Sequence, residues 1–102
     1  MPFVVENHRR TISIETAEIT EFSYTVEGIH EKIKARITES LDKDNDWPFY
    51  WEVSHDYDAF PDKPTSLMSP SSRNGRTFDE AYESMRAYLQ NMTPHLRLNE
   101  QY

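Results

Sequence analysis

The chain has 102 residues, enough for one domain with a modest hydrophobic core, and 13% of them are aromatic, which argues against global disorder. The formal net charge of -7 disfavours nucleic-acid binding by the whole surface, because that needs clustered Lys and Arg. Without cysteine there are no disulfides, thiol nucleophiles or thiolate metal sites. No apolar run approaches the roughly 18 residues of a membrane span. We therefore expect a soluble, cytoplasmic single domain over residues 1–102 that needs no cofactor.

The first predicted strands lie in the N-terminal quarter of the chain. Residues 11–19 alternate apolar and polar positions before the phase slips, which indicates a short strand that ends or bulges there. Residues 22–26 alternate more clearly and are rich in β-branched and aromatic side chains. Gly28 then marks a turn.

Residues 29–41 fit two periods. Ile29, Ile33 and Ile37 recur every four residues, as on a helix, whereas residues 33–38 alternate apolar and polar positions, as on a strand. We favour the strand, because the preceding Glu-Gly pair has hairpin character, no capping residue precedes Ile29, and a partner strand lies downstream.

Residues 49–57, FYWEVSHDY, carry the clearest strand pattern. They place Phe49, Trp51 and Val53 on one face and polar or amphipathic side chains on the other. Two segments are predicted to lack regular structure, the proline- and serine-rich loop 59–76 and a flexible tail at 95–102.

Residues 78–92 are predicted to form a helix with its own start and stop signals. Thr77 supplies an N-cap oxygen, Glu80 completes a capping box, and Pro94 ends the helix. Apolar side chains at spacings of three and four form one stripe that must be buried: Phe78, Ala81, Tyr82, Met85, Leu89 and Met92. Together the segments predict an α+β domain in which an antiparallel sheet of three or four strands is packed on one face by the C-terminal helix.

The order of three strands, a loop and a helix resembles the HicB-like antitoxin fold, a β-β-β-α fold similar in part to double-stranded-RNA-binding domains. The pattern spans residues 22–92, and the literal matches lie at the helix entrance: Gly75, Thr77, Asp79, Glu80 and Ala81. The resemblance implies a small module, often oligomeric, that binds a protein partner such as a toxin. The long loop departs from the family, whose turn before the helix is shorter.

Surplus aromatic residues and the lack of a catalytic set predict a non-enzymatic domain that binds a protein partner or forms a homodimer. We expect no membrane contact. The candidate interaction surface consists of aromatic and charged side chains expected outside the core: Tyr50, Glu52, Tyr57, Lys32, Lys34, Arg36, Arg73 and Arg76.

Two other classes of function stay open. The acidic composition is compatible with a DNA-mimic decoy that inhibits a nucleic-acid-binding protein. Alternatively, His55, Asp56 and Asp58 could form a small metal-dependent hydrolase site, because an imidazole beside two carboxylates supplies metal ligands or an oriented base.

Overall fold

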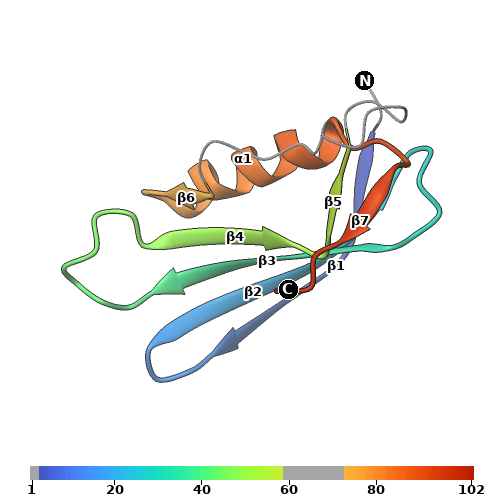
Figure 1. Ribbon diagram of the computed structural model, residues 1–102. Helices are drawn as coiled ribbons and strands as arrows, with labels where there is room; N and C mark the ends of the chain where they lie inside the picture. The colour runs from blue at the N-terminus through green and yellow to red at the C-terminus, as the bar shows by residue number, and fades with distance from the viewer. Residues whose placement is uncertain (1–2, 59–72) are drawn as a thin grey trace.

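The computed structural model describes residues 3–58 and 73–102, which form a five-stranded antiparallel sheet, one helix and a separate two-stranded sheet (Figure 1). The large sheet has the order β1-β2-β3-β4-β6, and the small sheet pairs β5 with β7. In chain order the elements are β1 (Val4–Ser13), β2 (Ala17–Val26), β3 (Ile33–Ser40), β4 (Phe49–Val53), β5 (His55–Tyr57), β6 (Asn74–Gly75), α1 (Phe78–Gln90) and β7 (Leu96–Leu98). The predicted α+β class, with the helix packed on an antiparallel sheet, is confirmed, although the sheet has five strands and not three or four.

The first four strands form a meander in which each pairs with the next along the chain. The strand predicted at residues 11–19 does end near the phase slip, but residues 11–13 are the last part of the longer β1 and residues 17–19 already belong to β2. Between them lies a tight turn in which Ile14 N–H bonds to the Ala17 carbonyl at 2.9 Å. This turn joins β1 to β2. A bulge between Glu6 and His8 shifts the register within β1.

The segment that fitted two periods is a strand, since β3 occupies Ile33–Ser40. Gly28, with φ of 84°, lies in the turn that leads to it, in a conformation that side chains other than glycine rarely adopt. Pairing with β2 on one side and β4 on the other satisfies the backbone of β3, so the alternating pattern prevails over the four-residue one.

The helix begins as the sequence predicts. Thr77 has an extended backbone, and its hydroxyl accepts a hydrogen bond from Glu80 N–H at 3.1 Å. The helix ends at Gln90, with Asn91 as the C-cap, a little before the predicted end. At the entrance, a Cβ on Gly75 would lie 2.8 Å from the Ala81 nitrogen, so the short β6 can approach α1 closely only because this residue is glycine.

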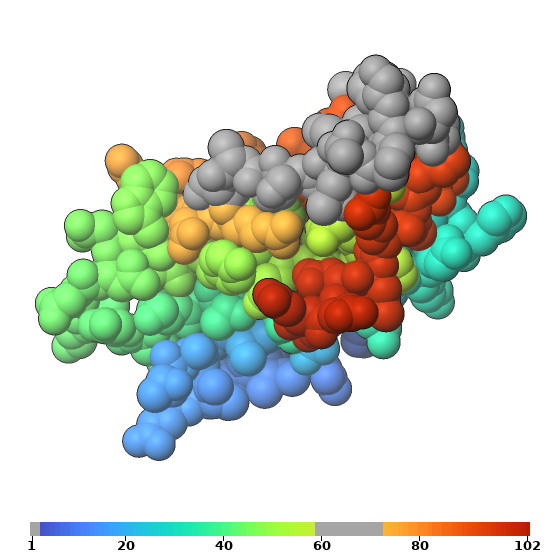
Figure 2. Space-filling model, in the orientation of Figure 1, coloured from blue at the N-terminus to red at the C-terminus, as the bar shows by residue number. Residues whose placement is uncertain are grey.

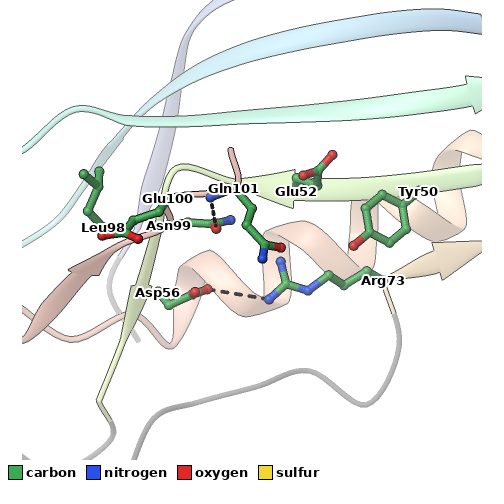
Figure 3. Close-up of a pocket in the computed structure, with 8 residues that line it drawn as sticks. All are labelled: Tyr50, Glu52, Asp56, Arg73, Leu98, Asn99, Glu100 and Gln101. Carbon is green, nitrogen blue, oxygen red and sulfur yellow. Dashed lines mark hydrogen bonds and ion pairs between the residues drawn. The ribbon is translucent and has the colours of Figure 1, made fainter.

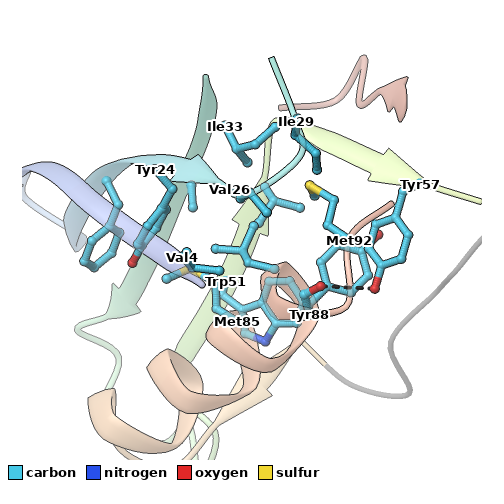
Figure 4. Packing of buried hydrophobic residues seen from close by; sticks show 14 of the residues in the cluster. Val4, Tyr24, Val26, Ile29, Ile33, Trp51, Tyr57, Met85, Tyr88 and Met92 are labelled. Atoms are coloured by element: carbon cyan, nitrogen blue, oxygen red, sulfur yellow. Dashed lines mark hydrogen bonds between the residues drawn. The ribbon is translucent and has the colours of Figure 1, made fainter. Parts of the chain in front are cut away.

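The core lies between α1 and one face of the large sheet (Figure 4). Trp51 is fully buried, and its ring centroid lies 5.5 Å from that of Tyr88, which in turn lies 4.8 Å from Tyr57. The apolar stripe of the helix is buried at four positions and half-buried at Phe78 and Tyr82. Tyr88, which that stripe omitted, is also buried. Covering these large side chains stabilises the fold by roughly 1.5–3 kcal/mol for each.

The C-terminal residues do not form the predicted free tail. Instead β7 pairs antiparallel with β5, and beyond it Asn99 Nδ2 donates to the Val53 carbonyl at 3.0 Å. A three-residue strand such as β7 is too short to show a period, which is why the sequence did not reveal it. The prediction of a loop over residues 59–76 is also partly wrong, since Asn74–Gly75 forms β6. The remainder of that prediction, residues 59–72, lies outside the described residues. Among the described residues, no helix is long and apolar enough to cross a bilayer.

Candidate functional site

The sheet face opposite α1 carries charges of alternating sign. Four side chains occupy neighbouring positions across the first four strands, in the order Arg10, Glu21, Arg36 and Glu52, which we call the charge row. An Arg10 Nη atom lies 3.2 Å from Glu21 Oε1, and Arg36 Nε lies 3.2 Å from Glu52 Oε1. Such partly exposed pairs contribute only about 0–1 kcal/mol each. The row therefore shapes the surface more than it holds the sheet together.

The adjacent row on the same face is largely apolar. It runs through Ile12, Ile19, Thr38 and Tyr50, and we call it the isoleucine row. Tyr50 is 40% exposed, and Ile14, in the turn that follows β1, is 50% exposed. Apolar and charged side chains thus lie next to each other on a surface that α1 leaves open.

A basic hollow lies on the β1 side of this face. His8 and Lys34 flank Ser23 in the strand register, and Arg10 and Glu21 border them. The hollow has a volume of about 210 Å³. Within residues 3–58 and 73–102, neither His8 nor Lys34 forms an ion pair, and both side chains are exposed.

An acidic groove lies on the β4 side, between the strand and the C-terminal residues (Figure 3). Its volume is about 520 Å³, and it is lined by Tyr50, Glu52, Asp56, Arg73, Leu98, Asn99, Glu100 and Gln101. Three carboxylates line the groove against one guanidinium. Arg73 lies 3.6 Å from Asp56, and Glu52 pairs with Arg36. Glu100 forms no ion pair in the part of the chain that the structure describes.

The C-terminal residues cover part of this open face. The ring of Tyr102 lies 4.4 Å from the Arg36 guanidinium carbon, and burial raises the pKa of the Tyr102 hydroxyl. Figure 2 shows the C-terminal segment, in red, raised above the strands, whereas none of it lies over the blue β1–β2 hairpin in that view. The β3–β4 half of the face is therefore partly covered and the β1–β2 half is bare.

Most of the predicted interaction residues do lie outside the core. Lys34, Arg36, Tyr50 and Glu52 share the open face, and Arg73 joins Tyr50 and Glu52 in the acidic groove.

Two of the predicted basic residues lie away from this group. Lys32 is exposed just before β3. The guanidinium of Arg76 stacks over the ring of Trp47, with its carbon 4.4 Å from the ring centroid.

The prediction that Tyr57 belongs to the interaction surface is wrong. It is 1% exposed, and its hydroxyl donates to the Tyr88 carbonyl at 3.1 Å, so it belongs to the core and not to an interaction surface. The reason is that β5 belongs to the small sheet, where the Tyr57 ring packs against that of Tyr88 with 4.8 Å between the centroids.

The structure gives His55, Asp56 and Asp58 separate partners. His55 Nδ1 lies 2.8 Å from the Ser54 hydroxyl, Asp56 accepts from the Tyr88 hydroxyl at 2.9 Å, and Asp58 accepts from Arg97 Nε at 3.0 Å. Across the two described ranges, no group of three or more His, Asp or Glu residues is placed to hold a metal ion. Asp56 thus connects β5 to the helix, and Asp58, just after β5, connects to Arg97 of β7.

Sequence reasoning missed Arg10, Glu21 and Glu100. Arg10 and Glu21 become neighbours only through the β1–β2 register, and Glu100 reaches the groove only because β7 docks on β5. The charged residues of each strand were visible in the sequence, but their alternation across the four strands depends on the register.

Comparison of the chain with protein-family models, curated proteins and solved structures gives no match.

Proposed function

We propose that this protein is a non-enzymatic interaction domain that binds a protein partner through the open face of its large sheet. The observation that supports this proposal is the isoleucine row beside the charge row. Ile12 and Ile19 of this row are only half-buried and Tyr50 is 40% exposed, and Ile14, in the turn just after β1, is 50% exposed. Apolar side chains bordered by charged ones are typical of protein interfaces.

The balance of charge on this face favours a protein over a nucleic acid. In the charge row each arginine stands beside a glutamate, so the face offers no continuous basic strip for phosphates. The same alternation weakens the DNA-mimic alternative, which needs an uninterrupted ridge of carboxylates. The resemblance to HicB-like antitoxins suggests a toxin as one kind of partner, and it stays a prediction.

A pair of lysine substitutions tests the proposal. Ile12→Lys places a charge in the isoleucine row, while Ala87→Lys places the same charge on the exposed side of α1, away from the sheet. We expect affinity capture from cells that express the protein, or self-association of the purified chain, to be lost with Ile12→Lys and kept with Ala87→Lys. Equal behaviour of both variants and the wild type would contradict the proposal.

A further inference from the structure

We infer that the partner on the open face is a second copy of this chain, related by a two-fold axis that runs parallel to the strands between β2 and β3. This inference rests on the proposed function of the face and names its occupant. It follows from the symmetry of the charge row, in which positive and negative side chains alternate from Arg10 to Glu52.

The direction of the axis follows from the signs of these charges. A two-fold axis along the strands reverses the order of the row, so Arg10 meets Glu52 of the second copy and Glu21 meets its Arg36. An axis at right angles to the strands keeps the order, and Arg10 would then meet Arg10. The surfaces that meet at a two-fold interface must be complementary to themselves, and the charge row meets this condition only when the axis runs parallel to the strands.

The same axis matches the neighbouring rows. It moves no residue along the strand direction, so the isoleucine row of one copy faces the isoleucine row of the other. Ile12 then lies against Tyr50 of the second copy, and Ile19 against its Thr38. The apolar row is thereby removed from water beside the paired charges, which stabilises the complex.

The two hollows of the face are also complementary. The acidic groove lies on the β4 side and the basic hollow on the β1 side, so the axis brings each against the other. The Arg10 side chain is 61% exposed and long enough to extend toward the groove near Glu52. Glu100 of one copy likewise lies on the side that faces His8 of the other, and neither residue has an ion pair among the described residues.

The shape of the open face also fits this arrangement. The C-terminal residues raise the β3–β4 half, where Tyr102 stacks on Arg36, and leave the β1–β2 half bare. The axis places the raised half of each copy over the bare half of the other. The C-terminal residues of each copy therefore become part of the contact surface.

The decisive test mixes two charge-reversal variants of the full chain. In Arg10→Glu the new glutamate faces Glu52 of the second copy, and in Glu52→Arg the new arginine faces Arg10. For each variant alone, the dimer dissociation constant measured by sedimentation should rise about tenfold or more, because like charges then meet at both ends of the row. When mixed, the two variants should form a heterodimer, since both end pairs are complementary again. Lys43→Glu, in the exposed turn before β4, is the matched control and should leave the dimer unchanged.

A double variant separates this role from the pairing within each sheet. Arg10→Glu with Glu52→Arg in one chain restores both contacts between copies, yet it leaves like charges side by side on β1–β2 and on β3–β4. We expect it to dimerise like the wild type. A double variant that folds, as judged by circular dichroism, but stays monomeric would show that the row serves only the sheet and would overturn the inference.

The wild-type protein distinguishes failure of this inference from failure of the proposed function. A wild type that is monomeric at all concentrations overturns self-association. If Ile12→Lys then still abolishes capture of a different protein, the face remains an interaction surface. If it changes neither capture nor self-association, both proposals fail.

Discussion

The two faces of the large sheet are made by the same strands and have opposite characters. On β4, Trp51 is 0% exposed under the helix, whereas its neighbour Tyr50 is 40% exposed on the open face. On the covered face Tyr82 donates a hydrogen bond to Glu6 at 3.0 Å, and on the open face Arg10 forms an ion pair with Glu21 at the surface. Aromatic content alone therefore does not tell a core face from an interaction face, and the position within the alternation does.

The largest expected difference between the faces comes from truncating neighbouring aromatic residues. Trp51→Ala should lower the free energy of unfolding by about 3–5 kcal/mol, because it leaves a cavity beside Tyr88. Tyr50→Ala should change it by less than about 1 kcal/mol. Urea denaturation of both variants measures the contrast, and comparable losses would mean that the open face is packed as tightly as the covered one.

Alkaline pH should act mainly through the covered face. Burial raises the pKa of both Tyr24 and Tyr88 above the ordinary value of 10.0, with hydrogen bonds to Tyr82 and Asp56 adding to the effect. Below pH 10 these hydroxyls are neutral in both states. As pH rises above 10, the unfolded chain ionises first, so the free energy of unfolding should fall.

Denaturation on either side of pH 10 tests this expectation. The Tyr24→Phe variant should lose less stability across that range than the wild type, because one of the shifted groups is absent. An equal loss in both proteins would count against the buried hydroxyl as the cause.

The helix cap should have an intermediate effect. Thr77→Ala removes the oxygen that accepts from Glu80 N–H and should lower the free energy of unfolding by about 1 kcal/mol. Thr77→Ser keeps the hydroxyl and serves as the control. A full loss with serine would point to the lost methyl group and not to the cap.

The smallest change is expected for a single charge on the open face. Arg10→Ala should alter the unfolding free energy of the monomer by less than about 0.5 kcal/mol, since the Arg10 and Glu21 side chains are 61% and 39% exposed. Thermal unfolding under conditions that favour the monomer would measure it. A loss as large as that of the cap variant would show that the charge row contributes to the stability of the sheet itself.

The sequence predicted the elements whose signals are local. The hydroxyl of Thr77 and the acidic first turn placed the helix start, and the alternation around Trp51 placed β4 and its buried side. Most of β1 was missed, because the bulge after Glu6 reverses the phase within the strand and cancels the periodic signal.

The functional face was predictable only in part. Tyr50 and Glu52 belong to one strand, and their common orientation follows from its period. The charge row depends on the registers of three strand pairs, and the acidic groove depends on the docking of β7. A pairing register is set by the whole fold, so a single sequence without homologues does not reveal it.

The pairing of β5 with β7 also implies an order of assembly. The meander joins strands through short connections, whereas Tyr57 meets Leu96 only after the chain has passed through the entire helix. Closing such a long loop costs more chain entropy, so we expect the meander to form early and the terminal strand to dock last. Amide hydrogen exchange should then be faster at Leu98 and Asn99 than in β3, and the acidic groove would be the last feature of the surface to appear during folding and the first to vanish when the protein opens.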